Sequence, residues 1–268
     1  MALHFSKEEF SNRKTNVLKS MKEQNLNALL MFKQESMYWL TGYDTFGFVF
    51  FQSLILRDDG EIILLTRAPD LRQAQNTSVI KDIRIWVDKD KSNPENELKN
   101  ILSELGLEKS NLGVEYEAYG LTGRNAIRLN NSIKNFATLH DKSELISFLR
   151  VVKSPTEIVY VKKAAELADK AMDAAWKYAH AGQNESKILA EIGYIYHKQS
   201  DKWTILESAC DYIYIGNHLL EFNIPGTLKI INNYTKWIIV CNRSIQIISL
   251  ALSHEFFVDN VGNETLYH

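Results

Sequence analysis

Cysteine, proline and net charge are all scarce in this chain. It has two cysteines and four prolines in 268 residues, and its formal net charge is −2. Cys210 and Cys241 form neither a metal-binding spacing nor a disulfide framework, so we expect a reducing, cytoplasmic compartment. Because no block of basic residues could contact phosphates, the composition also argues against a nucleic-acid partner.

Long hydrophobic runs are absent as well. The most apolar late run, Trp237 to Leu252, is interrupted by Asn242, Arg243 and Gln246, so it is too short and too polar to span a bilayer. The first 14 residues carry charges where a signal peptide has its apolar centre. We therefore expect neither a membrane partner nor a secretory leader.

The first 148 residues carry alternating signals for helices and strands. Ser6 and Glu9 form a capping box before a helix, and residues 27–32 are a continuous apolar run typical of a buried strand. Asp58, Asp59 and Gly60 separate the apolar segments 48–57 and 61–66, which predicts a β-hairpin. Further helices are expected within 69–76, 93–106, 121–130 and 141–149, and further strands at 83–87, 112–116 and 136–139. In the helix within 121–130, Ala126, Ile127 and Leu129 are expected to face the core. These elements predict an α/β domain whose mixed sheet is flanked by helices.

A long helix that begins at Pro155 is predicted within the stretch 149–176, and it marks a domain joint. Ser154 and Glu157 form a second capping box, with Pro155 at the first helical position, where no N–H donor is needed. Gly182 is a plausible stop for this helix, and Asn184 or Ser186 begins another. We expect residues 149–199 to join the first domain to the rest of the chain.

Residues 200–268 have a different composition. They are rich in isoleucine and asparagine, and they contain few caps or amphipathic patterns, so we expect a poorly ordered tail. Short apolar runs occur at 212–215, 227–231 and 237–240, but they predict no consistent fold. One hypothesis is that an AT-rich gene is read out of frame here, which a three-frame translation would test.

An aromatic segment at residues 35–47 is the main candidate for a contact site. It has two interpretations: a core edge followed by a loop, or a loop that faces a ligand or a partner, because loops with large aromatic side chains are common binding anchors. The candidate contact residues are Tyr38, Trp39, Tyr43, Asp44 and Phe46.

Other patterns predict no catalytic centre. Neither cysteine has a nucleophile-like neighbourhood, and the glycines near residue 120 lack the spacing of a phosphate-binding loop. Glu115 and Glu117 alternate around Tyr116 and are expected on one side of a strand, either as a cation-binding pair or as a surface pair. His140 fits a surface or capping role.

Three stretches resemble the creatinase, prolidase and aminopeptidase P family. They are residues 38–43 (YWLTGY), residues 112–115 (LGVE), and the joint that runs from Leu149-Arg150 through KSPTEI to KKAA. The resemblance covers residues 5 to about 195. It implies a creatinase-type N-terminal domain, related to ribonuclease H in layout, followed by the opening helices of the catalytic pita-bread domain.

The same resemblance implies a hydrolase of C–N bonds with two divalent metal ions, Mn, Zn or Co. Two Asp, one His and two Glu would hold the metals, and hard oxygen ligands with a histidine suit such ions. Eight residues after position 195 have suitable side chains but not the family's order: Asp201, Asp211, Asp259, His218, His254, Glu221, Glu255 and Glu264. We therefore predict that this chain has no catalytic or metal-binding residue.

These observations lead to one main hypothesis and two alternatives. The main one is a truncated, non-catalytic form that keeps an N-terminal domain (1–148), a linker with the first pita-bread helices (149–199) and an atypical tail (200–268). It would form a homodimer and cover the partner's active site. The alternatives are an active Xaa-Pro peptidase or ectoine hydrolase-like enzyme with a divergent C-terminus, and a binding module for a small amine or amino acid.

Overall fold

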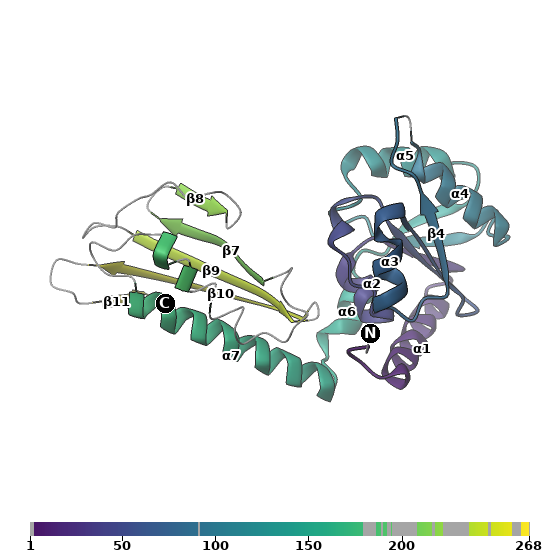
Figure 1. Ribbon diagram of the computed structural model, residues 1–268. Coiled ribbons are helices and arrows are strands. Elements are labelled where there is room, and N and C mark those ends of the chain that lie inside the picture. Colours follow the sequence, from purple (N-terminus) through teal and green to yellow (C-terminus); the bar gives the residue numbers. More distant parts are fainter. Residues whose placement is uncertain are drawn as a thin grey trace. The chain divides into compact units, whose positions relative to one another are not determined.

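A computed structural model describes most of the first two thirds of the chain and several later strands. The described residues are 3–90, 92–178, 186–188, 190–191, 194, 208–215, 218–221, 236–245, 248–258 and 264–267. The chain divides into two compact units, Met1–Val152 and Lys153–His268 (Figure 1).

The first unit is built around a six-stranded mixed sheet. Its strand order is β4-β3-β2-β1-β5-β6. The central pairs β1–β2 and β2–β3 are antiparallel, whereas β3–β4, β1–β5 and β5–β6 are parallel. The strands are β1 (Ala28–Met31), β2 (Ser53–Arg57), β3 (Ile62–Arg67), β4 (Asp82–Trp86), β5 (Asn111–Val114) and β6 (Thr138–Asp141). The prediction of a mixed sheet is confirmed.

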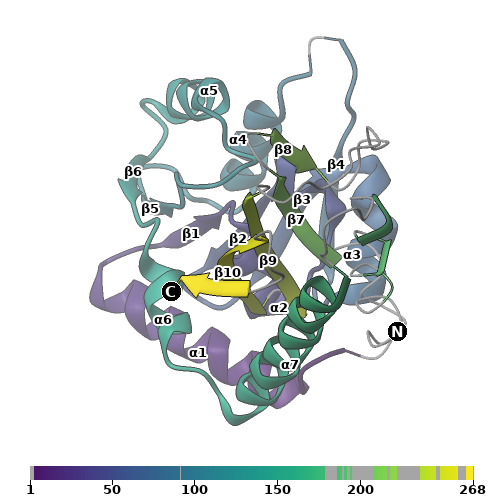
Figure 2. The same ribbon diagram turned by 90° about the vertical axis from the view of Figure 1, so that its left-hand side faces the viewer.

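Helices cover both faces of this sheet. The α-helices are α1 (Lys7–Glu23), α2 (Gln34–Thr41), α3 (Leu71–Thr77), α4 (Pro94–Glu104), α5 (Gly123–Ile133) and α6 (Leu145–Val151), and the 3-10 helices are η1 (Phe46–Val49) and η2 (Ala68–Asp70). In β1, Ala28 and Leu30 pack with α4 and α5, whereas Leu29 and Met31 pack with α1, α2, α3 and α6. Figures 1 and 2 show α1 beside α6. Alternate residues of a strand point to opposite faces, so one apolar strand serves two cores.

Capping and turn residues in the sequence predicted most of these helices and strands correctly. The Ser6 hydroxyl accepts a hydrogen bond from the Glu9 amide at 3.1 Å, which caps α1 as predicted. The β2–β3 hairpin turns at Gly60, whose φ of +91° lies in the region that glycine adopts without strain.

Two local predictions were wrong. Residues 48–52 do not extend the strand: β2 begins at Ser53, and the preceding residues form η1 and a loop. Ile127 was expected to face the core, but 64% of its surface is exposed, whereas Leu129 is fully buried. The reason is that Ala126, Leu129 and Ile133, three and four positions apart, form the face of α5 that packs on the core, and Ile127 lies outside this spacing.

The second unit begins with α7 (Pro155–Tyr178). The Ser154 amide donates to the Glu157 carboxylate at 2.7 Å, and the Glu157 amide donates to the Ser154 hydroxyl at 3.1 Å. This confirms the second capping box and the predicted start of the helix at Pro155, after the separate helix α6. Residues 186–188 are helical, and Gly182 lies outside the described residues.

The described later residues form an antiparallel five-stranded sheet. Its order is β11-β10-β9-β7-β8, and α7 lies against β9 and β10. The strands are β7 (Ser208–Ile215), β8 (His218–Glu221), β9 (Lys236–Ile245), β10 (Ile248–Val258) and β11 (Glu264–Tyr267). The apolar runs 212–215 and 237–240 lie in β7 and β9, whereas 227–231 lies outside the described residues. The domain boundaries at 148 and 199 and the disorder of the tail stay predictions.

Within the described residues, no helix has the length and apolar character needed to cross a membrane.

Candidate functional site

The five candidate contact residues do not all lie at the surface. Tyr38, Trp39 and Tyr43 are buried, with exposed fractions of 2%, 8% and 0%. Asp44 is partly buried, and desolvation raises the pKa of its carboxyl. Phe46 begins η1. The first three therefore lie in the core edge that one interpretation describes, and the last two begin a surface segment.

That segment, residues 44–52, is called the aromatic loop below, and a buried polar network supports it. The Tyr43 hydroxyl donates to the Gln52 side-chain oxygen at 2.6 Å and lies 3.1 Å from the Thr66 hydroxyl. The Gln52 amide group donates to the Gly47 carbonyl. Burial raises the pKa of Tyr43 to about 12, so the hydroxyl stays protonated and can donate at neutral pH.

A second support joins the aromatic loop to η2. The Thr45 hydroxyl accepts from the Gly47 amide at 2.9 Å and donates to Asp70 at 3.1 Å, and Arg67 also binds Asp70 at 3.1 Å. A Cβ atom at Gly47 would lie 2.5 Å from the Asp70 carboxylate oxygens, so only glycine fits there without a shift. The aromatic loop is therefore fixed at both ends by buried polar groups.

The outer surface of the aromatic loop is apolar. Val49, Phe50 and Tyr119 are 50%, 41% and 79% exposed, and we call these three residues the apolar patch. Tyr119 reaches the loop through an edge-on contact with Phe48, with ring centroids 5.9 Å apart. A Cβ atom at Gly120 would lie 2.4 Å from the Phe50 carbonyl oxygen, so the two backbones are in close contact.

The apolar patch consists of residues outside the five candidates that the aromatic segment gave. Val49 and Phe50 belong to an apolar run that predicted a strand, and Tyr119 lies about seventy residues away in sequence. Gly47 and Gly120 are the sequence signals that could have located this surface. A glycine within or beside an apolar run often marks close approach of two backbone segments.

The expectation that Glu115 and Glu117 share one face was wrong. β5 ends at Val114, so the period of two does not continue, and Glu115 is fully buried while Glu117 is exposed. Glu115 accepts hydrogen bonds from the Phe32 and Lys33 amides at 3.1 and 3.0 Å, and from the Ser36 hydroxyl at 2.6 Å. Burial raises its pKa to about 7, against the opposing effect of these hydrogen bonds and of Lys33.

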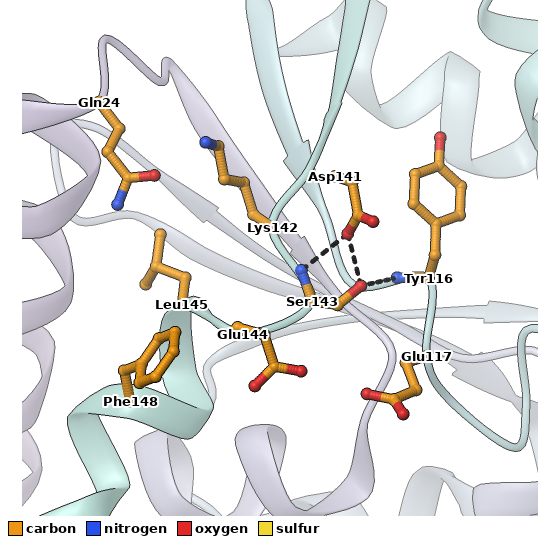
Figure 3. A pocket seen from close by; sticks show the side chains of 9 residues that line it. All are labelled: Gln24, Tyr116, Glu117, Asp141, Lys142, Ser143, Glu144, Leu145 and Phe148. Atoms are coloured by element: carbon orange, nitrogen blue, oxygen red, sulfur yellow. Dashed lines mark hydrogen bonds between the residues drawn. The ribbon is translucent and has the colours of Figure 1, made fainter.

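A hollow of about 690 Å³ lies beside Glu117, where the parallel strands β5 and β6 end (Figure 3). Gln24, from the C-terminal end of α1, and Phe148, from α6, form one side of it. Crevices at the carboxyl ends of parallel strands are the usual ligand sites of open α/β sheets.

The metal-binding set that the resemblance implies is not brought together in the described part of the chain. No three His, Cys, Asp or Glu side chains there are close enough to hold a metal ion. Of the eight suitable residues after position 195, Asp201 and Asp259 lie outside the described residues, and the other six lie on strands β7, β8, β10 and β11.

Comparison with known proteins identifies the first unit. Residues 13–152 match the creatinase/prolidase N-terminal domain. An uncharacterized hydrolase/peptidase of Sinorhizobium fredii is 28% identical over 204 residues, which are 74% of this chain and 51% of that protein. The ectoine hydrolase of Halomonas elongata is 26% identical over 211 residues, or 76% of this chain and 52% of that protein. The chain spans about half the length of these relatives.

Solved structures share the fold. The prolidase of Thermococcus sibiricus superposes with a TM-score of 0.71 at 17% identity, over 93% of this chain and 66% of that one. The Xaa-Pro dipeptidase of Bacillus anthracis gives a TM-score of 0.67 at 17% identity, over 94% of this chain and 66% of that one. With its matched domain, its mixed sheet and these neighbours, the chain belongs to the creatinase, prolidase and aminopeptidase P family.

Proposed function

We propose that the first unit makes the oligomer contacts of a creatinase- or aminopeptidase P-like protein and covers the active site of a partner subunit. The observation that carries this proposal is the apolar patch, which is exposed although its supporting loop is fixed by buried hydrogen bonds. An exposed apolar surface on a rigid support is typical of an interaction site.

The chemistry of the apolar patch suits a protein partner. The Arg67 guanidinium lies 3.4 Å from the centre of the Phe50 ring and is also paired with Asp70. Aromatic and arginine side chains of this kind commonly anchor interfaces. We extend the contact to Asp44 and Phe46, which begin the aromatic loop, whereas Tyr38, Trp39 and Tyr43 support it from the core.

A pair of matched substitutions tests this role. Val49→Asp places a charge in the apolar patch, and Ile127→Asp places the same charge on another exposed apolar residue, in α5 and outside the patch. We expect a wild-type homodimer, a dissociation constant raised at least about tenfold by Val49→Asp, and no change for Ile127→Asp. Sedimentation velocity over a concentration series measures this. A wild-type monomer, or a Val49→Asp dimer as tight as wild type, would exclude the proposal.

The alternative is an active, metal-dependent C–N hydrolase, an Xaa-Pro peptidase or ectoine hydrolase-like enzyme, whose ligands come from the second unit. The names of the relatives favour it, and so does the position of His218, His254 and Glu255 on strands of one sheet. Metal analysis together with hydrolysis of Xaa-Pro dipeptides separates the two candidates. Stoichiometric manganese, zinc or cobalt with turnover would replace the non-catalytic role, whereas neither metal nor turnover would favour it.

The cellular setting is also a proposal. Two cysteines without a disulfide pattern suit a reducing compartment, and we therefore propose the cytoplasm.

A further inference from the structure

Strand β4 has a neighbouring strand on one side only, within the described part of the chain. It lies at an edge of the six-stranded sheet and pairs there with β3. The strand contains no proline or lysine, residues that commonly protect such edges from pairing with another chain. Its two charged side chains, Asp82 and Arg84, bind each other at 2.6 Å, and Arg84 also binds Glu104 of α4 at 3.3 Å. The strand itself therefore has no net charge that would repel a second strand.

Two apolar side chains lie exposed along this edge. Ile85 is 47% exposed, and Val87, which directly follows the strand, is 56% exposed. The other edge strand of the sheet, β6, is described in full and has no exposed large apolar side chain. Of the two edges, β4 is therefore the one with apolar surface left to bury.

The alternation of side chains continues past the end of β4. Trp86 is buried and is paired in register with Arg67, and the Asp88 carboxylate lies 4.0 Å from the same arginine. Trp86 and Asp88 therefore point to one side of the sheet. Ile85 and Val87 point to the other side, because successive residues of a strand alternate between the two faces.

We propose that β4 pairs antiparallel with β4 of a second copy of this chain, about a two-fold axis that passes through Trp86. Ile85 of each copy then lies opposite Val87 of the other, and Arg84 opposite Asp88. Apolar pairs and pairs of opposite charge both stabilise antiparallel strands. A symmetric contact of this kind joins the two sheets into one and gives the outer backbone groups of both edges a partner.

Neighbouring registers lack this complementarity. Residues equally far from the axis face each other, so moving the axis one residue toward the N-terminus places Asp82 opposite Asp88. Moving it two residues in that direction places Arg84 opposite itself. A move of three residues in that direction, or of one residue in the other, places Ile85 opposite a lysine. Like charges opposite each other destabilise the pairing, which favours the axis at Trp86.

This inference rests on the proposed homodimer and locates its axis beside the support of the apolar patch. The Trp86 Nε1 group donates to the Phe51 carbonyl at 3.0 Å. Arg67, the register neighbour of Trp86, lies over the ring of Phe50. The contact at β4 therefore continues the surface that the apolar patch begins.

A mixture of two charge variants tests the pairing in the full chain. In a homodimer, Arg84→Glu places carboxylates opposite Asp88, and Asp88→Arg places guanidinium groups opposite Arg84. We expect each variant alone to raise the dissociation constant at least about fivefold, because like charges then meet at two positions. An equimolar mixture should return to within about twofold of wild type, because both opposite-charge pairs form again between the two chains. Sedimentation velocity with one variant fluorescently labelled measures the mixed dimer.

Two controls separate this pairing from effects within one chain. Asp82→Arg mixed with Arg84→Glu should show no recovery, because Asp82 binds Arg84 in its own chain and does not lie opposite it in the dimer. Ile85→Asp should weaken the dimer at least about tenfold, whereas Ile127→Asp, on an exposed residue of α5, should not.

A mixture of Arg84→Glu and Asp88→Arg that dimerises no better than either variant alone would overturn this inference. So would an Ile85→Asp dimer as tight as wild type, and recovery in the mixture with Asp82→Arg would overturn the register. Val49→Asp distinguishes this inference from the proposed function. If Val49→Asp weakens the dimer and the mixture does not recover, the β4 pairing alone fails. If the mixture recovers and Val49→Asp has no effect, the role of the apolar patch alone fails.

Discussion

The buried carboxylate of Glu115 makes the stability of the first unit depend on pH. Its pKa is about 7 in the folded chain, against 4.5 for an ordinary glutamate, and burial is the largest cause. The folded state therefore binds a proton more tightly than the unfolded state. The contribution of Glu115 to stability is largest below about pH 4.5, falls as the pH rises toward 7, and is constant above that. The difference of about 2.5 pKa units corresponds to about 3 kcal/mol.

Glu115→Gln isolates this effect because it keeps the hydrogen bonds. One carboxylate oxygen accepts from both the Phe32 and Lys33 amides, so the glutamine oxygen can replace it. The other oxygen accepts from the Ser36 hydroxyl, to which the glutamine NH₂ group can donate instead. We expect the variant to match wild type near pH 4 and to be more stable by up to about 3 kcal/mol near pH 8.

Urea unfolding between pH 4 and pH 8 measures the difference between variant and wild type. Glu117→Gln is the matched control, because its carboxylate is exposed and paired with Lys33, and it should change stability by less than about 1 kcal/mol at any pH. A difference that does not vary with pH would refute the reasoning. A wild-type protein that gains stability as the pH rises would show that the hydrogen bonds outweigh desolvation.

Two further predictions concern the supports of the fold. Gly47→Ala should cost about 1–3 kcal/mol in urea unfolding, because its Cβ atom would lie 2.5 Å from the Asp70 carboxylate, whereas Gly123→Ala, with no atom within 4 Å, should be close to neutral. Equal effects would contradict this account. Glu95 is fully buried, forms no hydrogen bond through its carboxylate oxygens among the described residues, and lies 3.7 Å from Arg128. Glu95→Met should therefore be neutral or stabilising, whereas Arg128→Met should cost about 1–3 kcal/mol, and thermal unfolding that reverses this order would refute it.

The features that could be predicted from the sequence are those decided within a few residues. Both capping boxes form because Ser6 and Glu9, and likewise Ser154 and Glu157, are three positions apart. The β2–β3 hairpin follows from the turn at Gly60. The alternating order of predicted helices and strands was then enough to predict that the first unit is an α/β domain.

The candidate sites depend on contacts between distant residues, which no local pattern reports. Glu115 is buried because Phe32 and Lys33, more than eighty positions earlier, donate to it. The apolar run 46–51 suits a strand as well as a loop, and only the contacts of Gly47 and Gln52 decide between them. The hollow at Lys142 brings together the residue that follows α1, the segment after β5, the end of β6 and helix α6.

The contacts that support the apolar patch and those beside the hollow are connected through the segment between β1 and α2. Glu115 binds the backbone of Lys33 just before α2, and the Lys33 ammonium reaches Glu117 and the Ser143 carbonyl beside the hollow. At its other end, α2 leads into Tyr43, whose hydroxyl supports the aromatic loop. A helix of eight residues is not stable alone, so its position depends on such tertiary contacts. The Glu115 carboxylate therefore helps to fix both surfaces, although it belongs to neither.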